Sequence, residues 1–226
     1  MTFPYHNFSE SPLDTSTFAP KSISPTFYRT FGKRCLDVSL VLISAPVVLL
    51  VVVLLAVFVA LDGSNPFYFQ KRIGRNGRVF TMWKLRSMVR NADARLEAHL
   101  ETDPQARCEW DSTQKLKSDP RITSIGGILR KSSLDELPQL WNVLKGDMSL
   151  VGPRPMMLCQ KEMYPGRDYY ALRPGITGPW QVSARNESTF ADRAKFDTKY
   201  NRSMSLKTDV GLILATVKVV LRATGH

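Results

Sequence analysis

Histidine and cysteine are scarce in this chain of 226 residues, and their scarcity limits the chemistry that it can perform. Two of the three histidines, His6 and His226, lie close to a terminus, so Ser-His-Asp or Cys-His catalysis has little material to work with. The three cysteines are widely spaced and form no Cys-x-x-Cys pair, which disfavours a cysteine-ligated metal and fits a reducing environment. Catalytic proton transfer is therefore expected from carboxylates or lysines.

Glycine-rich phosphate loops are also missing, because neither a Walker A nor a Gly-x-Gly-x-x-Gly pattern occurs. Gly74 and Gly77 are close together, but they fall between two runs typical of strands, Phe67 to Gln70 and Val79 to Trp83. An Asn-Gly pair between two strands is a strong hairpin signal. We therefore interpret these glycines as turn residues rather than phosphate ligands.

Acidic residues are outnumbered by basic ones, 20 against 31, and the resulting net charge of +11 favours polyanionic partners. Nucleic acid, anionic lipid and phosphorylated substrates all carry such charge. Because the basic residues are spread over the chain and no nucleic-acid-binding module is recognisable, we expect no nucleic-acid partner. The length favours one compact domain with one or two attached elements.

Charge is absent altogether from Val38 to Leu61, a run of 24 residues. A straight helix of that length, at about 1.5 Å per residue, exceeds the ~30 Å hydrocarbon core of a bilayer. Pro46 interrupts it, because proline lacks a backbone donor and clashes with the carbonyl four residues earlier. The two arms, Val38–Ala45 and Val47–Leu61, are about 12 and 22 Å long, so neither spans the core alone.

Basic residues flank this apolar run on both sides, and short flanks rich in Lys and Arg prefer the cytoplasm. They are Lys33, Arg34, Lys71, Arg72, Arg75 and Arg78. We therefore predict a re-entrant helix over residues 33–62, with a tilted, kinked spanning helix as the alternative. Ser44 is expected to bond a carbonyl freed at Pro46. Lys33 and Arg34 are expected to pair with Asp37 and to anchor the helix at anionic membrane lipids. Residues 1–32, rich in Ser, Thr, Pro and Phe, are predicted to form a mobile tail.

Helical patterns dominate the rest of the chain. Ala92 to Glu101 has good helix formers, whereas Asp119-Pro120 starts a turn into an extended piece, Arg121 to Ile125, before Gly126-Gly127. Two further segments repeat apolar residues every three or four positions, which marks helices with one buried face. These stripes are Leu134, Leu137, Leu140, Trp141 and Leu144, and Leu206, Val210, Ile213, Leu214, Val217, Val220 and Leu221. For the second stripe we favour packing on the core over lying on the membrane surface.

Asp135 and Glu136 stand in the segment with the densest polar residues, beside Arg130, Lys131, Asp147 and Arg154. Ser133 and Glu136 also match a capping box, in which both side chains only satisfy free amides at a helix start. Pro138 disfavours that alternative, because it would fall where the helix needs an amide donor.

A helix starting near Asp135 would place both carboxylates beside its positive end, which keeps Asp135 ionised and attracts phosphate. An ionised carboxylate there can act as a nucleophile if a divalent ion and arginines neutralise the phosphate. Glu136, Arg130 and Arg154 are the residues that suit those two roles.

Ordered motifs from Lys33 to the C-terminal helix resemble those of the bacterial sugar transferases, the small monotopic phosphoglycosyl transferases. They are Lys33-Arg34-x-x-Asp37, Phe80-x-x-x-Lys84-x-Arg86-Ser87-Met88, Asp119-Pro120-Arg121-Ile122-Thr123, Leu129-Arg130-Lys131-x-Ser133-Leu134-Asp135-Glu136-Leu137-Pro138-Gln139-Leu140, Gly146-Asp147-Met148-Ser149, Val151-Gly152-Pro153-Arg154-Pro155, Arg173-Pro174-Gly175-Ile176-Thr177-Gly178, Trp180-Gln181-Val182 and Asp197-x-x-Tyr200. Two positions depart from the family: Ala45-Pro46 replaces the usual Ser-Pro, and Ala184 replaces a glycine.

The resemblance implies that an aspartate, here Asp135, attacks the sugar-bearing phosphate of a UDP-sugar and releases UMP. Polyprenyl (undecaprenyl) phosphate then accepts the sugar phosphate, which initiates an exopolysaccharide repeat unit. By position, Glu136 is the Mg²⁺-associated carboxylate, and the matching phosphate-site residues are Arg130, Arg154, Lys84, Arg173 and Asp197.

The implied location is the cytoplasmic face of the bacterial inner membrane. Similarity around Glu109-Trp110 and Lys115-Leu116 favours the galactosyl-phosphate transferases of exopolysaccharide initiation. A membrane-anchored assembly partner without catalysis is the alternative. We thus predict an α+β, mostly helical, monotopic protein with a small β-hairpin and a cytoplasmic catalytic domain over residues 63–226, and no feature indicates an oligomeric state.

Overall fold

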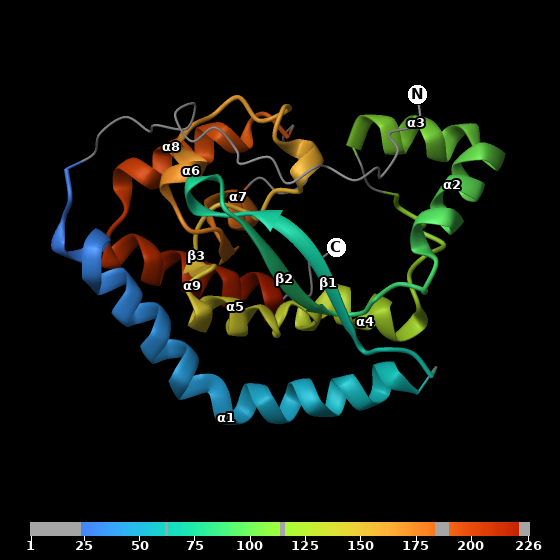
Figure 1. Cartoon of the computed structure of the whole chain (residues 1–226), viewed down its shortest axis with the longest axis horizontal. Helices are drawn as coiled ribbons and strands as arrows, with labels where there is room; N and C mark the ends of the chain where they lie inside the picture. Colours follow the sequence, from blue (N-terminus) through green and yellow to red (C-terminus); the bar gives the residue numbers. More distant parts are fainter. Residues whose placement is uncertain (1–23, 62, 114–115, 184–189, 222–226) are drawn as a thin grey trace.

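The computed structural model describes residues 24–61, 63–113, 116–183 and 190–221 (Figure 1). Most of these residues are helical, as predicted, and two small two-stranded sheets complete the fold. The α-helices are α1 (Lys33–Ala60), α2 (Ala92–Thr102), α3 (Pro104–Thr113), α4 (Ser124–Ser132), α5 (Gln139–Lys145), α6 (Asp168–Ala171), α7 (Pro179–Ser183), α8 (Arg193–Ser203) and α9 (Leu206–Leu221).

The predicted hairpin is confirmed: β1 (Phe67–Ile73) pairs antiparallel with β2 (Val79–Leu85). Its turn needs left-handed backbone at Asn76 (φ 57°) and Gly77 (φ 76°), which is the reason for the Asn-Gly pair. In this register Tyr68 lies opposite Lys84 and Arg72 opposite Phe80. Directly opposed residues share a sheet face, so Arg72 and Lys84 lie on the same face of the hairpin.

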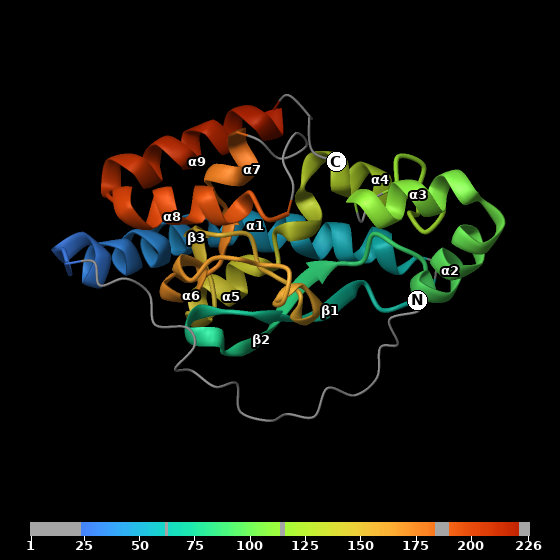
Figure 2. The same ribbon diagram turned by 90° about the horizontal axis from the view of Figure 1, so that it is seen from above.

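The body of the protein lies behind this hairpin. In Figure 2 the hairpin occupies one side, α8 and α9 occupy the other, and α5 with α1 lies between them. A second, parallel sheet joins β3 (Ser149–Val151) to β4 (Gly175–Thr177) inside the body. α2 and α3 project from one end (Figure 1), where Leu96 and Leu100 pack with Ala106 in a small separate cluster.

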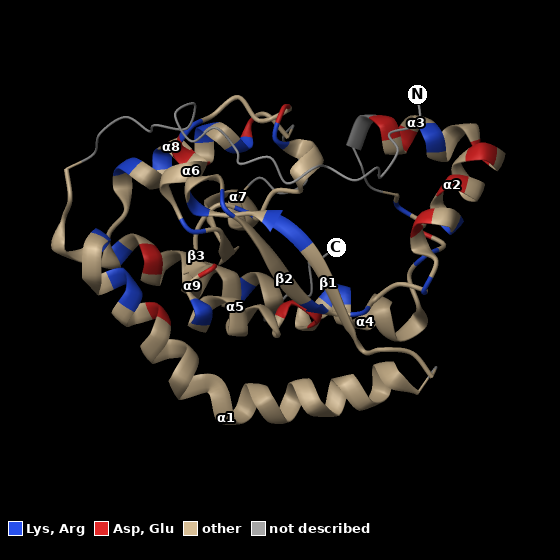
Figure 3. Ribbon diagram, in the orientation of Figure 1, with Lys and Arg blue, Asp and Glu red and all other residues tan. Residues whose placement is uncertain are grey.

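Helix α1 bends near its middle and carries Pro46 inside it (Figure 1). The Ser44 hydroxyl donates to the carbonyl of Val41 at 3.1 Å and not, as predicted, to a carbonyl freed by proline, which is that of Leu42 four residues before Pro46. Both the bend and the following arm are free of charged side chains (Figure 3). This helix is the one described segment that is long and apolar enough to cross a membrane.

The N-terminal arm of α1 is tied to the body. Lys33 Nζ lies 2.7 Å from Asp209 Oδ2 in α9, and both side chains are buried, so Lys33 pairs with Asp209 rather than with Asp37 as expected. Arg34 donates to the carbonyls of Val143 and Leu144 at the end of α5, at 2.5 and 2.8 Å. The Asp37 carboxylate instead accepts from the Leu150 amide. The entry to α1 is thus fixed by partners more than a hundred positions away.

The second arm returns to the same body. Val59 is buried against Leu85 and Leu129, and the Val59 carbonyl accepts a hydrogen bond from Arg86 Nη2 at 3.0 Å. Large apolar side chains between the two attachments are exposed: Leu42, Ile43, Val47, Leu49, Leu50, Val53, Leu54, Val57 and Phe58. α1 therefore leaves the body, bends, and rejoins it with an apolar surface facing outward.

The predicted mobile tail is too long at its C-terminal end. Tyr28–Gly32 forms one π-helical turn leading into α1, and the Tyr28 hydroxyl donates to Asp209 at 2.6 Å. Arg29 donates to the side chain and to the carbonyl of Asn201. The rest of the predicted tail, apart from residues 24–27, lies outside the described residues.

Three sequence interpretations about helices need correction. The extended piece predicted over Arg121 to Ile125 is shorter: Ile122 pairs with Met88 in an isolated bridge, but α4 begins at Ser124 and runs through Gly126-Gly127. The Thr123 hydroxyl caps α4 by accepting from the Gly126 amide at 2.9 Å. In α5 the fully buried residues are Gln139, Asn142 and Val143. Of the predicted apolar stripe, Leu134, Leu140 and Leu144 pack partly buried on the core, whereas Trp141 is exposed.

The predicted core stripe of α9 is likewise mostly exposed, at Leu206, Val210, Leu214, Val217 and Val220, whereas Leu212 and Ile213 pack on the body. An amphipathic pattern identifies a helix more reliably than it identifies which face is covered.

Gly126 shows why a glycine interrupts the α4 pattern. A Cβ at this position would lie 1.9 Å from the Ser87 carbonyl oxygen, so α4 approaches the chain after β2 at backbone distance. We expect Gly126→Ala to lower the melting temperature by several degrees, since a shift of ~1 kcal/mol moves it by about 2–4 °C. Gly211→Ala in α9, where a Cβ meets nothing within 4 Å, is the matched control and should be neutral or stabilising. Equal melting temperatures for the two variants would contradict this close contact.

Candidate active site

The two adjacent carboxylates lie in a short turn between two helices. α4 ends at Ser132, Ser133 follows in the left-handed region (φ 57°), and the 3-10 turn η4 (Leu134–Glu136) leads toward α5. The Ser133 side chain makes no capping bond to this turn, so the capping-box alternative is wrong. A left-handed residue other than glycine carries strain, and such residues cluster at functional sites.

Helical backbone begins at Leu134, close to the expected start, but as a 3-10 turn. The Glu136 and Leu137 amides bond the carbonyls of Ser133 and Leu134, and α5 proper begins only after Pro138. Pro138 therefore stands where its missing donor costs nothing, as expected. Fewer free amides than predicted therefore point toward Asp135, because the Glu136 and Leu137 amides already have carbonyl partners.

Lys84 of β2 lies between the two carboxylates. Its Nζ is 2.7 Å from Glu136 Oε1 and 3.6 Å from Asp135 Oδ2. Asp135 is only 7% exposed, and the side chains of Lys84 and Glu136 are largely covered too. Three charged side chains from two separate segments thus meet in one mostly buried place.

The buried side chain of Asn142 holds β2 against α5. Its Oδ1 accepts from the Trp83 amide at 3.1 Å and its Nδ2 donates to the Thr81 carbonyl at 2.8 Å. The side-chain amide of Asn142 thus makes the two hydrogen bonds to β2 that the backbone of a neighbouring strand would make. They fix the strand immediately before Lys84, and so fix the distance between Lys84 and the carboxylate turn.

Burial raises the pKa of the Asp135 carboxyl above its ordinary value, and the Glu136 charge raises it further. The Lys84 charge, followed by those of Arg130 and Arg154, acts in the opposite direction. The sequence predicts that a helix dipole keeps Asp135 ionised, but the groups that lower its pKa in the structure are basic side chains. Ionisation of Asp135 depends on nearby cations, chiefly Lys84, working against burial.

Arg130 and Arg154 complete this cluster of charges. Neither makes a hydrogen bond or an ion pair with another side chain in the part of the chain that the structure describes, although both act electrostatically on Asp135. Arginine groups without a protein partner beside a buried carboxylate suit a phosphate ligand. The structure thus brings together Lys84, Arg130, Asp135, Glu136 and Arg154, as predicted from the motifs.

Two other predicted site residues lie elsewhere. Arg173 donates through Nε to the Gly146 carbonyl at 3.0 Å and lines a pocket of about 210 Å³ at the hairpin turn, with Arg75 and Arg78. Its charged neighbours are not those of Asp135. Asp197 in α8 is buried and accepts from the Tyr164 hydroxyl at 2.6 Å. Burial raises the pKa of Asp197 to about 7.

Two further arginines are neighbours of the site: Arg72, which the sequence predicts only as a residue flanking the apolar run, and Arg193, which no sequence motif marks. The charge of Arg154 lowers the pKa of both, after burial, and each pKa falls to about 10. Arg154 therefore stands between the carboxylate cluster and two further arginines. Strand alternation alone places Arg72 on the face of Lys84, but nothing local marks the Nε atom of either arginine as buried.

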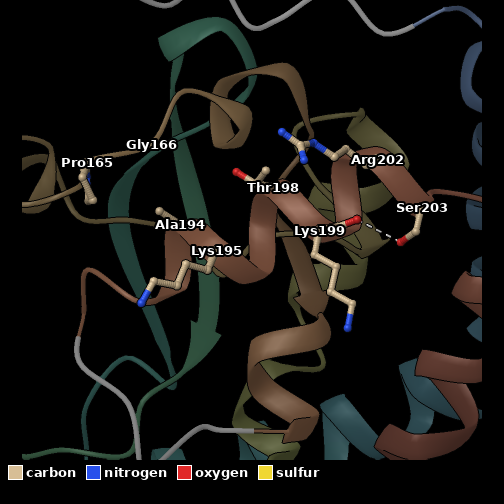
Figure 4. A pocket seen from close by; sticks show the side chains of 8 residues that line it. All are labelled: Pro165, Gly166, Ala194, Lys195, Thr198, Lys199, Arg202 and Ser203. Atoms are coloured by element: carbon tan, nitrogen blue, oxygen red, sulfur yellow. Dashed lines mark hydrogen bonds between the residues drawn. The ribbon is translucent and has the colours of Figure 1, made fainter.

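One surface hollow, of about 650 Å³, is shallow and contains none of the predicted site residues (Figure 4). Its lining comes from α8 and the loop at Pro165, and comprises Pro165, Gly166, Ala194, Lys195, Thr198, Lys199, Arg202 and Ser203. The chemistry is thus expected at the carboxylate cluster and not at this hollow.

The carboxylates of the cluster can bind Mg²⁺ only if oxygen atoms of the substrate provide further ligands. Within the described ranges, no group of three or more His, Cys, Asp and Glu side chains is arranged to hold a metal. Mg²⁺ commonly binds through one or two carboxylates, with water and substrate phosphates filling its other positions. Asp135 and Glu136 supply that number of carboxylates.

Comparison with known proteins gives a consistent family. The profile of the bacterial sugar transferases matches residues 28–223. The chain is 49% identical over 197 residues to the UDP-galactose-lipid carrier transferase of Erwinia amylovora, covering 86% of this chain and 41% of that protein. It is 46% identical over 199 residues to the undecaprenyl-phosphate galactose phosphotransferase of Salmonella typhimurium, covering 87% and 41%.

A third relative has nearly the same length. The exopolysaccharide production protein ExoY of Rhizobium meliloti is 41% identical over 215 residues, covering 94% of this chain and 93% of that protein. By contrast, the chain spans about two fifths of the first two relatives. The predicted resemblance is confirmed: the chain belongs to the bacterial sugar transferase family.

Proposed function

We propose that this protein transfers a sugar 1-phosphate, with galactose favoured, from a UDP-sugar to undecaprenyl phosphate, and so initiates an exopolysaccharide repeat unit. The observation that carries the proposal is the buried carboxylate of Asp135, held between Lys84, Arg130 and Arg154. The names of the two galactose-transferring relatives supply the substrates and the sugar. A non-catalytic assembly partner would have no use for this arrangement.

The proposed reaction has two displacements at phosphorus. In the first, an Asp135 oxygen bonds to the sugar-bearing phosphorus, and the bond to the bridging oxygen breaks, so UMP leaves with the electron pair. In the second, an oxygen of the lipid phosphate bonds to that phosphorus and the Asp135 carboxylate is released. Lys84, Arg130 and Arg154 neutralise the phosphate oxygens, which would otherwise repel the nucleophile.

Glu136 is the residue that we assign to Mg²⁺, with Asp135 close enough to share it. The ion, when bound, withdraws electron density from the phosphate oxygens. Lys84 lies 2.7 Å from Glu136, so it competes for the same carboxylate oxygen and would shift toward the phosphates when the metal is present. Removing Mg²⁺ with a chelator is expected to stop transfer and to be reversed by added Mg²⁺.

A screen of UDP-sugars tests the reaction and the sugar together. Purified protein with Mg²⁺ and undecaprenyl phosphate should release UMP fastest with UDP-galactose, and the lipid product should appear at the same rate. If UMP forms but no lipid-linked sugar appears, the protein only hydrolyses the donor, and the proposed transfer is wrong. Absence of UMP release with every donor would reject the enzymatic proposal.

We further propose that α1 enters one leaflet of the bacterial inner membrane from the cytoplasmic face and returns. Both of its arms contact one body, through Lys33 and Arg34 at one end and Val59 at the other, while the exposed apolar surface lies between. A helix with its ends on opposite sides of a bilayer could not keep both attachments. The carboxylate cluster would then stand where a soluble donor meets a lipid phosphate.

The native cysteines provide a topology test, because Cys35 precedes the apolar run and Cys108 and Cys159 follow it, and all three are exposed. Variants retaining one cysteine each are treated with a membrane-impermeant thiol reagent. We expect all three to react in inside-out vesicles and none in intact spheroplasts. Reaction of Cys35 alone from the outside would contradict re-entry.

A further inference from the structure

Three arginines form a cationic cluster next to the carboxylates, although they come from three distant segments. Arg72 lies at the end of β1, Arg154 lies between β3 and η5 (Leu158–Gln160), and Arg193 begins α8. The charge of Arg154 lowers the pKa of both other arginines, and the charge of Arg72 also lowers that of Arg193. Folding therefore brings together like charges that repel one another.

Specific contacts hold Arg72 against the loop of Arg154. Its Nη1 donates to the Pro155 carbonyl at 3.1 Å, and the Ile73 amide donates to the Met156 carbonyl at 3.0 Å. The Tyr169 hydroxyl bonds both Ile73 and Met156, and so locks strand and loop together. Arg72 Nη2 donates to the Gln70 side chain, whereas its buried Nε has no hydrogen-bond partner among the described residues.

Arg193 is held on several sides. Its guanidinium lies 4.1 Å from the Trp180 ring centroid and 4.5 Å from the Phe190 ring centroid, which is the geometry of cation–π contact. The Asp197 charge attracts it, but the Asp197 carboxylate already accepts a bond from Tyr164. Arg193 Nε is also buried without a hydrogen-bond partner. Buried donors of this kind normally have an acceptor, and here the described residues provide none.

The cluster is continuous with the reactive end of the site. Arg72 and Lys84 lie on one face of the hairpin, and four residues of strand, about 13 Å, separate their positions along it. Because both side chains are long and Arg154 acts on Asp135 as well as on the other two arginines, one extended anion can contact all of them. The Asp197 carboxylate draws Arg193 inward, and the three arginines outnumber this one negative charge.

We propose that Arg72 and Arg193, together with Arg154, form the subsite for the nucleoside-linked phosphate of the donor diphosphate. The proposal rests on the proposed function and adds two donor-binding residues to it. When the phosphorus–oxygen bond breaks, the electron pair passes to the bridging oxygen, which departs on the nucleoside monophosphate. Arg72 and Arg193 then neutralise the charge that this leaving phosphate gains. Asp197 and Tyr164 act as positioning residues for Arg193.

Nucleotide binding tests the subsite without requiring turnover. Affinities for UDP and for uridine are measured by calorimetry on the full chain in detergent, for the parent, Arg72→Gln and Arg193→Gln. Each variant is expected to bind UDP about tenfold more weakly or worse, since a charge-assisted contact to phosphate is lost, with unchanged affinity for uridine. Arg202→Gln, an exposed arginine of the same helix as Arg193, is the control and should bind UDP like the parent.

Unchanged UDP affinity in folded Arg72→Gln and Arg193→Gln would overturn the subsite. If the glutamine variants fail to fold, Arg72→Lys and Arg193→Lys keep the charge, and we expect a severalfold weaker affinity for UDP. Parent-like affinity in both lysine variants would also overturn it. A parallel titration with a short-chain polyprenyl phosphate separates the two phosphate sources, since losses confined to the lipid would reject a donor subsite.

Arginine-dependent UDP binding in a protein that transfers no sugar phosphate would support the subsite and reject the proposed function. Normal transfer with an unchanged KM for the donor in both glutamine variants would support the proposed function and reject the subsite. The two proposals therefore fail separately.

Discussion

Replacing Asp135 with asparagine is expected to lower the rate of sugar-phosphate transfer by roughly 10⁴-fold or more, as loss of a catalytic nucleophile usually does. The asparagine amide has the shape of the carboxylate, so the turn between α4 and α5 should persist, but it forms no ester with phosphorus. UMP release and lipid product are measured with the favoured donor. Asp111→Asn, in the exposed helix α3, is the control and should retain full activity.

The same substitution is expected to stabilise the protein at neutral pH. Burial raises the pKa of Asp135 above its unfolded value, so its favourable contribution is complete below the unfolded pKa and is lost as pH rises through the folded pKa. At neutral pH the ionised form is therefore the unfavourable one, and asparagine removes that charge. Thermal unfolding of parent and variant across pH should give a stability gap that widens as pH rises from the unfolded pKa to the folded pKa of Asp135 and is constant above it. A variant that is inactive and also much less stable would point to a structural role for Asp135.

Removing the Lys84 charge is the second change with a large expected effect. Lys84 is the strongest of the cations that lower the pKa of Asp135, so Lys84→Met should raise that pKa further. A smaller fraction of Asp135 is then ionised at neutral pH, and the acid limb of the kcat/KM profile moves to higher pH. Transfer at neutral pH should fall by about 10²-fold or more, the usual size of a lost electrostatic contact at a reacting centre.

Lys84→Arg keeps the charge and should leave the acid limb near its original position, with a smaller loss of rate. Lys207→Met, on the exposed side of α9, serves as the control for loss of one lysine. The shift of the pH profile separates an electrostatic role from a structural one, because a misfolded fraction lowers the rate at all pH values equally. An unshifted acid limb in Lys84→Met would show that another group sets the ionisation of Asp135.

Features with local causes were predictable from the sequence. The hairpin follows from Asn76-Gly77 between two apolar runs, and Pro46 indicates a break in the long helix that Figure 1 displays as a bend. The carboxylate turn was located by Pro138, whose missing amide restricts where a helix can start. In each case one or two residues restrict the backbone whatever surrounds them.

Features set by distant contacts were not predictable. Gly126 resembles a helix breaker until its approach to Ser87 is known, and the partner of Lys33 is Asp209, near the other end of the chain. The parallel pair β3 and β4 has three residues in each strand and no local signal. At the site itself, burial of Asp135 reverses the direction expected from a helix dipole, because desolvation outweighs a short helix.

The half-buried arginines are a related case. From the sequence, Arg72 and Arg193 look like ordinary surface residues in a strand and a helix, since arginine is mostly exposed. Only the fold shows that Tyr169 locks one of them against the loop of Arg154 and that two aromatic rings hold the other. The sequence motifs therefore located the reacting carboxylate, whereas its extended cationic surroundings required the structure.

The most direct measurement of the central proposal is mass spectrometry of the protein after incubation with UDP-galactose and Mg²⁺, without lipid acceptor. We predict one hexose phosphate per chain, located by peptide mapping on Asp135 and removed when undecaprenyl phosphate is added. Lipid product formed with no protein adduct in the parent, or an adduct on a residue other than Asp135, would contradict the account.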